Sequence, residues 1–163
     1  FPDSGHTSLL APPLSPVFAA EVQRRGLHVG IGESLVDAGA VDAPQLLGII
    51  RTLEVPLVLL FNSGRVMVLP QGVSKATGLR AALDTLRLSA RNTLAIGDAE
   101  NDHELLRLAE VGAAVEWGSP ALRAVADLVV PGSGPPDVAS FVQAVAATGQ
   151  LPPVPRARRR LLL

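Results

Sequence analysis

The sequence predicts an α/β fold in two parts. In the second half of the chain, apolar segments of strand length alternate with segments of helical periodicity, which is typical of a parallel sheet with helices on both faces. In the first half, Asn62-Ser63-Gly64 separates two apolar runs and gives a good β-hairpin signal. A hydrophobic fraction of 48% is ample for a core. We therefore expect a small α/β lobe followed by a parallel-sheet lobe.

The first lobe is expected over residues 1–70. Its best-defined helix runs from Ser15 to Arg25, because Ser15 is a good N-cap and Pro16 suits the first helical position. The other expected elements are a short strand at 8–10, a strand at 28–32, a helix that follows its cap Asp42 and stops before Pro56, and hairpin strands at 57–61 and 65–69.

The second lobe is expected over residues 71–148. Its elements, in order, are a helix at 74–86, a strand at 93–96, a helix at 101–110, a strand at 111–115, a helix at 120–126, a strand at 127–130 and a helix at 136–147. Residues 149–163, rich in proline and arginine, are expected to be a linker or tail.

The run Gly97-Asp98-Ala99-Glu100-Asn101-Asp102 follows a predicted buried strand and opens a helix. Open α/β sheets bind ligands at this carboxyl edge. Asp98 is a candidate ligand for Mg²⁺, which prefers carboxylates, water and phosphate oxygens. Asp102, four residues on, can face the same pocket directly or through a water, and Asn101 can hold a neighbouring carboxylate. The alternative is an ordinary helix start, where acidic and amide side chains cap the positive end of the helix.

Lys75 is the only lysine of the chain and stands at the start of a predicted helix. A cation is electrostatically misplaced there, because that end of a helix favours anions. The position suggests that Lys75 serves an anion. The alternative is an ordinary exposed lysine.

These motifs resemble the last two motifs of the haloacid dehalogenase (HAD) superfamily, and in particular its Cof-like sugar-phosphatase branch, where the acidic motif reads G-D-x-x-N-D. The resemblance implies the C-terminal part of a Rossmann-like sheet and a Mg²⁺-dependent phosphatase acting on a small phosphorylated metabolite through an aspartyl-phosphate. It implies a catalytic role for Lys75, metal binding by Asp98 and Asp102, and supporting roles for Asn101 and Gly97.

The resemblance also implies that the first lobe is the cap that selects the substrate. It rests there on Phe61-Asn-Ser-Gly and on the run from Val66 to Lys75. Asn62, Ser63 and Arg65 are the expected cap-side contacts.

The D-x-D-G-T motif of the family, which carries the nucleophilic aspartate, does not occur in these 163 residues. The chain opens on Phe1 and closes on Arg158-Arg-Arg-Leu-Leu-Leu163, and we expect it to be cut from a longer polypeptide. We expect it to be inactive alone and to need the missing N-terminal segment, in the same parent chain or in trans. In the family that segment supplies the strand beside 93–96, so we expect an open sheet edge and a poorly soluble or oligomeric product.

Composition excludes several other classes. The net charge of −1 gives no argument for nucleic acid or an anionic membrane, and we expect neither as a partner, the arginine-rich tail included. No apolar run approaches the roughly 18 residues of a membrane span. The absence of cysteine excludes disulfides and fits a cytoplasmic setting.

Two other functions are weighed against the phosphatase. One is a non-catalytic HAD-like regulatory or scaffold domain of a larger protein. The other, ranked last, is a generic nucleotide-binding domain, which lacks the expected glycine-rich phosphate loops.

Overall fold

The computed structural model describes residues 11–62 and 64–154, which belong to two compact units that divide between Val73 and Ser74. The elements of the first unit are α1 (Pro16–Arg24), β1 (Gly30–Ile31), β2 (Val36–Gly39), η1 (Ala40–Asp42), α2 (Ala43–Leu53), β3 (Leu57–Asn62) and β4 (Arg65–Pro70). Those of the second are α3 (Lys75–Leu86), η2 (Ala90–Asn92), β5 (Leu94–Gly97), η3 (Glu100–Asp102), α4 (His103–Leu108), β6 (Val111–Val115), α5 (Pro120–Val125), β7 (Leu128–Val130) and α6 (Pro135–Thr148). The strand expected at 8–10 and the tail from residue 155 lie outside the described residues.

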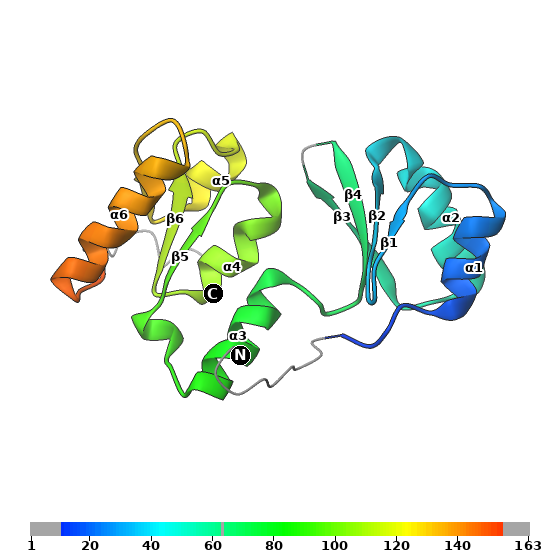
Figure 1. The fold of residues 1–163 in the computed structure, drawn as a ribbon, viewed down its shortest axis with the longest axis horizontal. Helices are drawn as coiled ribbons and strands as arrows, with labels where there is room; N and C mark the ends of the chain where they lie inside the picture. The colour runs from blue at the N-terminus through cyan, green and yellow to red at the C-terminus, as the bar shows by residue number, and fades with distance from the viewer. Residues whose placement is uncertain (1–10, 63, 155–163) are drawn as a thin grey trace. The chain divides into compact units, whose positions relative to one another are not determined.

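The first unit is an antiparallel sheet of order β1-β2-β4-β3 with α1 and α2 on one face (Figure 1). The two helices supply large apolar side chains to a single core, which the inward-facing residues of β2 and β4 complete. Its fully buried members are Phe18, Val22, Val36, Leu46, Ile49, Val66 and Val68. The opposite face of the sheet carries Asn62 and Arg65 at the end of the hairpin and apolar residues along the rest of it, namely Val58, Leu60, Met67 and Leu69.

Most expected elements of the first unit are confirmed. The Oγ of Ser15 accepts a hydrogen bond from the Phe18 amide at 3.4 Å, so the predicted cap of α1 is present. Asn62 pairs with Arg65 at the end of the hairpin, and Gly64, just before Arg65, has a φ of 81°. Asp42 precedes α2 but makes no side-chain cap bond, so that detail was wrong.

The second unit is a parallel sheet of order β5-β6-β7. All five residues of β6 are buried, as expected for the central strand. On one face, α4 and α5 cover a cluster of buried residues, namely Ala95, Leu106, Ala109, Ala114, Leu122 and Ala126. Figure 1 shows α6 on the other side of the sheet. The predicted α/β fold, a parallel sheet with helices on both faces, is therefore confirmed.

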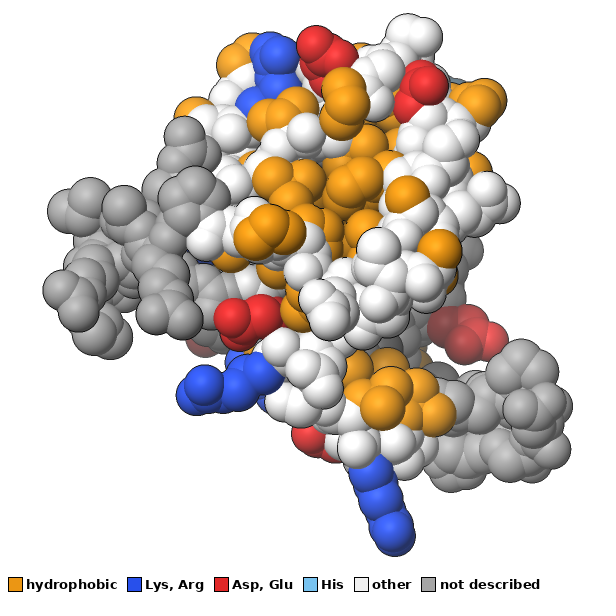
Figure 2. Space-filling view, turned by 90° about the vertical axis from the view of Figure 1, so that its left-hand side faces the viewer, with side chains coloured by type: hydrophobic (Ala, Val, Ile, Leu, Met, Phe, Trp, Pro, Cys, Tyr) orange, Lys and Arg blue, Asp and Glu red, His pale blue; other side chains and the backbone are white. Residues whose placement is uncertain are grey.

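Two elements of the second unit are incompletely covered. Among the described residues, β5 is an edge strand, and its Leu94 and Ile96 are only half-buried. No residue of α6 is buried, and Val142 is 45% exposed although it belongs to the apolar stripe of that helix. Figure 2 looks at the α6 side of this unit and shows hydrophobic side chains gathered across the middle of the surface. This side of the unit therefore exposes apolar surface among the described residues.

Within residues 11–62 and 64–154, no helix is long and apolar enough to span a membrane.

Candidate functional site

Asp98 lies directly after β5, at the carboxyl edge of the parallel sheet, and its backbone is held from two sides. Its amide donates to Oδ2 of Asp102 at 3.0 Å, and its carbonyl accepts from the Ser119 amide at 2.8 Å. The Asp98 side chain is exposed, and its carboxylate makes no hydrogen bond or ion pair with any described residue. The backbone is thus fixed while the carboxylate stays open to a ligand.

Asp102 is the best-held acid of the site. The residue is 2% exposed, its Oδ1 lies 2.5 Å from Nζ of Lys75, and its Oδ2 accepts from the amides of Asp98 and Ala99 at 3.0 and 3.4 Å. Burial alone would raise the pKa of this carboxyl group. The hydrogen bonds from Lys75 and the two amides outweigh burial, so the pKa lies below its usual value and Asp102 is ionised at neutral pH.

Lys75 is brought to Asp102 by the start of α3. Ser74 and Thr77 form a capping box there: the Thr77 amide donates to Ser74 Oγ at 3.3 Å, and the Ser74 amide donates to Thr77 Oγ1 at 2.9 Å. This capping box fixes the first turn of α3. The Lys75 side chain remains half-exposed where it reaches the buried carboxylate of Asp102. From its place at a helix start, we expected Lys75 to serve an anion. In this structure that anion is the carboxylate of Asp102.

Gly97 is required by the packing of Asp102. A Cβ on Gly97 would lie 2.5 Å from the Cβ of Asp102 and 2.8 Å from its Oδ2. Those distances are far inside van der Waals contact, so no larger residue fits unless Asp102 moves. The supporting role expected of Gly97 thus has a steric basis.

Asn101 is 9% exposed, and its Oδ1 is buried without a hydrogen-bond partner. We expected this side chain to hold a neighbouring carboxylate, and that contact does not occur among the described residues. Lys75 and the two backbone amides hold Asp102 instead. A buried carbonyl oxygen without a donor is costly, and it is a suitable partner for a cation or a ligand donor.

The loop after β6 contributes to the site in a way that the sequence analysis missed. A Cβ on Gly118 would lie 2.9 Å from the carbonyl oxygen of Asp98, so only glycine lets this loop approach. Ser119 both binds the Asp98 carbonyl through its amide and caps α5 through its Oγ. The signal was Gly118-Ser119-Pro120 two residues after a buried strand, which places a helix start at the same sheet edge.

The cap-side candidates lie in the first unit. Asn62 and Arg65 face each other at the end of the hairpin. The guanidinium of Arg65 binds Asp37 through two hydrogen bonds, one of them from Nε to Oδ1 at 2.9 Å. This hydrogen-bonded guanidinium holds the pKa of Asp37 below its usual value. Ser63 lies outside the described residues.

The oxygen donors of the second unit fit a hard cation with few protein ligands. Asp98 offers a free carboxylate and Asn101 an unpartnered carbonyl oxygen, whereas both oxygens of Asp102 are already engaged. In the described part of the chain, no group of three or more His, Cys, Asp or Glu side chains is placed to hold a metal. Mg²⁺ commonly binds through one or two carboxylates together with waters and substrate phosphates, so the residues present fit it.

Comparison with known proteins identifies the family. The pattern of the haloacid dehalogenase-like hydrolases matches residues 53–134, half of the chain, including Lys75 and the whole acidic run. The chain belongs to this family. The resemblance on which the sequence analysis relied is therefore confirmed.

Relatives of this chain include the phosphoglycolate phosphatase of Natronomonas pharaonis, 45% identical over 62 residues, which are 38% of this chain and 27% of that protein. The chloroplastic endoribonuclease YBEY of Arabidopsis thaliana is 40% identical over 68 residues, 42% of this chain and 12% of that protein. The match thus spans well under half the length of either relative. The structure of a HAD subclass IIB sugar phosphatase has a TM-score of 0.55 at 20% identity, over 71% of this chain and 43% of that one, and shows the shared fold.

Proposed function

We propose that this chain carries the metal-binding and charge-neutralising half of a Mg²⁺-dependent phosphatase for a small phosphorylated metabolite. The observation that carries the proposal is the cluster of Lys75, Asp98 and Asp102 at the carboxyl edge of the sheet, with a free Asp98 carboxylate beside the ion pair of the half-exposed Lys75 and the buried Asp102. Such an edge is where α/β sheets bind phosphate-bearing ligands.

Each residue has a distinct task in this proposal. Asp98 holds the cation, and Asn101 turns its unpartnered oxygen toward the same ligand shell. Lys75, half-exposed, donates a hydrogen bond from its ammonium group to a phosphoryl oxygen and remains charged. Asp102 keeps that ammonium group in place and keeps its negative charge near the cation, directly or through a water. Bound Mg²⁺ would neutralise charge on the phosphoryl oxygens.

The nucleophile has to come from outside the residues described. No D-x-D pair occurs in the sequence, and the family resemblance assigns the attack to such an aspartate, through an aspartyl-phosphate. Among the described residues, β5 has an unpaired edge and α6 has no buried residue, which supports a further segment that packs against both. We propose that this segment brings the nucleophile and that the isolated chain does not turn over phosphate esters.

The substrate proposal rests on the relatives. One is named a phosphoglycolate phosphatase and another a sugar phosphatase, and both names describe small phosphorylated metabolites. Asn62 and Arg65 are proposed to contact the substrate from the cap. Asp37 would orient the guanidinium of Arg65 for that contact.

The test is phosphatase turnover by a longer protein that joins this chain to its D-x-D segment, assayed with Mg²⁺ on small phosphate esters. We expect turnover that chelation abolishes and that Asp98→Ala or Lys75→Ala lowers by at least about 100-fold, as for groups that stabilise transition-state charge. Arg80→Ala, which removes an exposed cation from the same helix as Lys75, is the matched control and should leave turnover unchanged. Full activity in Asp98→Ala or Lys75→Ala would refute the assignment.

A second candidate is a non-catalytic domain of a larger protein. The match to only 12% of the Arabidopsis protein favours it, because it shows that a segment of this kind occurs within a much longer chain. The turnover assay separates the two, since a scaffold domain would show no Mg²⁺-dependent activity even when the chain is extended.

A further inference from the structure

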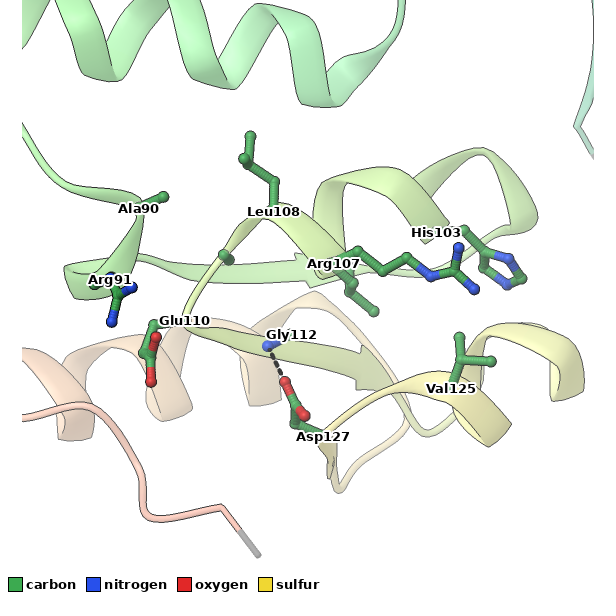
Figure 3. A pocket seen from close by; sticks show the side chains of 11 residues that line it. Ala90, Arg91, His103, Arg107, Leu108, Glu110, Gly112, Val125 and Asp127 are labelled. Carbon is green, nitrogen blue, oxygen red and sulfur yellow. Dashed lines mark hydrogen bonds between the residues drawn. The ribbon is translucent and has the colours of Figure 1, made fainter. Parts of the chain in front are cut away.

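A cavity of about 520 Å³ opens in the second unit beside α4, between η2, the start of β6 and the end of α5 (Figure 3). None of the residues that line it belongs to the cluster of Lys75, Asp98 and Asp102. Its volume lies in the usual range for sites that bind small molecules. The charged and titratable residues of its lining are Arg91, His103, Arg107, Glu110 and Asp127.

One end of the cavity offers hydrogen-bond donors. His103 and Arg107 stand four residues apart on α4, so their side chains lie on the same face of the helix. Figure 3 shows the Arg107 side chain running toward the His103 ring. Arg107 makes no ion pair with any residue of the described part, and the Nε2 of His103 is buried without a hydrogen-bond partner. A buried polar nitrogen without a partner is costly, and an oxygen acceptor in the cavity would satisfy both groups.

The lower wall of the cavity offers an acceptor. Asp127 receives the Gly112 amide on Oδ2 at 2.9 Å, the bond drawn dashed in Figure 3. Its Oδ1 makes no hydrogen bond within residues 11–62 and 64–154. A ligand that carries hydroxyl or amino hydrogens can therefore donate to this oxygen. Leu106 and Val125 give the cavity apolar walls between the two polar ends.

We propose that this cavity binds a small organic anion. The acidic group of the ligand accepts hydrogen bonds from Arg107 and His103, and its hydroxyl or amino groups donate to Asp127. An inorganic anion satisfies only the donor end and leaves Oδ1 of Asp127 without a hydrogen-bond donor. The cavity therefore selects a molecule with both kinds of group.

The test is an NMR titration of the ¹⁵N-labelled chain without divalent cations, so that the Asp98 edge is not loaded. The probe is glycerol 3-phosphate, and its two halves, inorganic phosphate and glycerol, are titrated separately. We expect saturable shifts at residues 103–112 and 125–127 with glycerol 3-phosphate, weaker binding of phosphate, and none of glycerol.

Two pairs of variants complete the test. Arg107→Gln should weaken binding about tenfold or more, as expected for a lost charge-assisted hydrogen bond, whereas Arg80→Gln, outside the cavity, should not. Val125→Trp should fill the cavity and abolish binding, whereas Val125→Ala should preserve binding. Because Val125 is 46% exposed, both variants should fold, and their amide spectra will check this. Absence of a saturable shift would overturn the proposal. So would shifts centred on residues 97–102, or equal weakening by Arg107→Gln and Arg80→Gln.

Discussion

At the scale of single residues, Asp102 organises the site. One of its oxygens forms the ion pair with Lys75, and the other accepts hydrogen bonds from the backbone amides of the Asp98 loop. One buried carboxylate therefore fixes both the lysine ammonium group and the turn that presents Asp98. Removing Lys75 would leave the buried carboxylate of Asp102 without its counter-charge, which is costly. The site therefore depends on Asp102 for its shape as well as for its charge.

The ionisation of Asp102 predicts a pH-dependent stability. Its pKa in the folded chain is lowered, so its stabilisation is fully present above the usual Asp pKa of about 3.9 and is lost as the pH falls through the lower folded value. We expect Asp102→Asn to cost about 1–3 kcal/mol at pH 7. The difference from the wild type should shrink below about pH 4. Urea unfolding of the wild type and of Asp102→Asn at pH 7 and pH 3 measures this difference in the free energy of unfolding. The same difference at both pH values would contradict this account.

Gly97→Ala tests the close packing of β5 against Asp102. The new methyl group would overlap the Asp102 side chain, and overpacking of this kind costs about 1–3 kcal/mol. Gly48→Ala, inside α2 with open space around its Cα, is the matched control and should stabilise the chain by about 0.5–1 kcal/mol. Thermal or urea unfolding of both variants checks the prediction, which fails if the two changes have the same effect.

At the scale of elements, the segments that the sequence predicted well are those with strong local signals. The Ser15-Pro16 start of α1, the hairpin turn before Arg65 and the fully apolar β6 were all identified. Strand β2 was missed, because Val36-Asp-Ala-Gly39 is short and of low strand propensity, and its pairing with β4 comes from a distant part of the chain. The lysine–aspartate pair likewise joins residues 27 apart, which no local pattern reveals.

The exposed apolar stripe of α6 and the edge of β5 predict that the isolated chain associates. We expect sedimentation velocity to show larger species as concentration rises. Val142→Lys should reduce them with little change in stability, since Val142 is exposed. Val17→Lys, at a 62% exposed position of α1 in the first unit, is the control and should leave association unchanged. A monomer at every concentration would argue against an uncovered face.

At the scale of the whole molecule, the chain brings a lysine and two aspartates to one sheet edge, for which we propose a phosphoryl ligand, and its sequence holds no D-x-D pair. The fold explains how these residues come together: one edge of the parallel sheet brings Asp98 and Asp102 together, and the first turn of α3 adds Lys75. Family and fold class could be predicted from the sequence because the motif is local. Substrate selection, the association state and a cytoplasmic location stay predictions.

The most direct test of the central claim is whether Asp98 binds a divalent cation. Mn²⁺, a paramagnetic substitute for Mg²⁺, should broaden the amide resonances of residues 97–101 and of Gly118 and Ser119, which contact the Asp98 backbone. Asp98→Asn should abolish this broadening, and Asp84→Asn, which removes an exposed acid from α3, should preserve it. Broadening centred elsewhere, or unchanged in Asp98→Asn, would contradict the account.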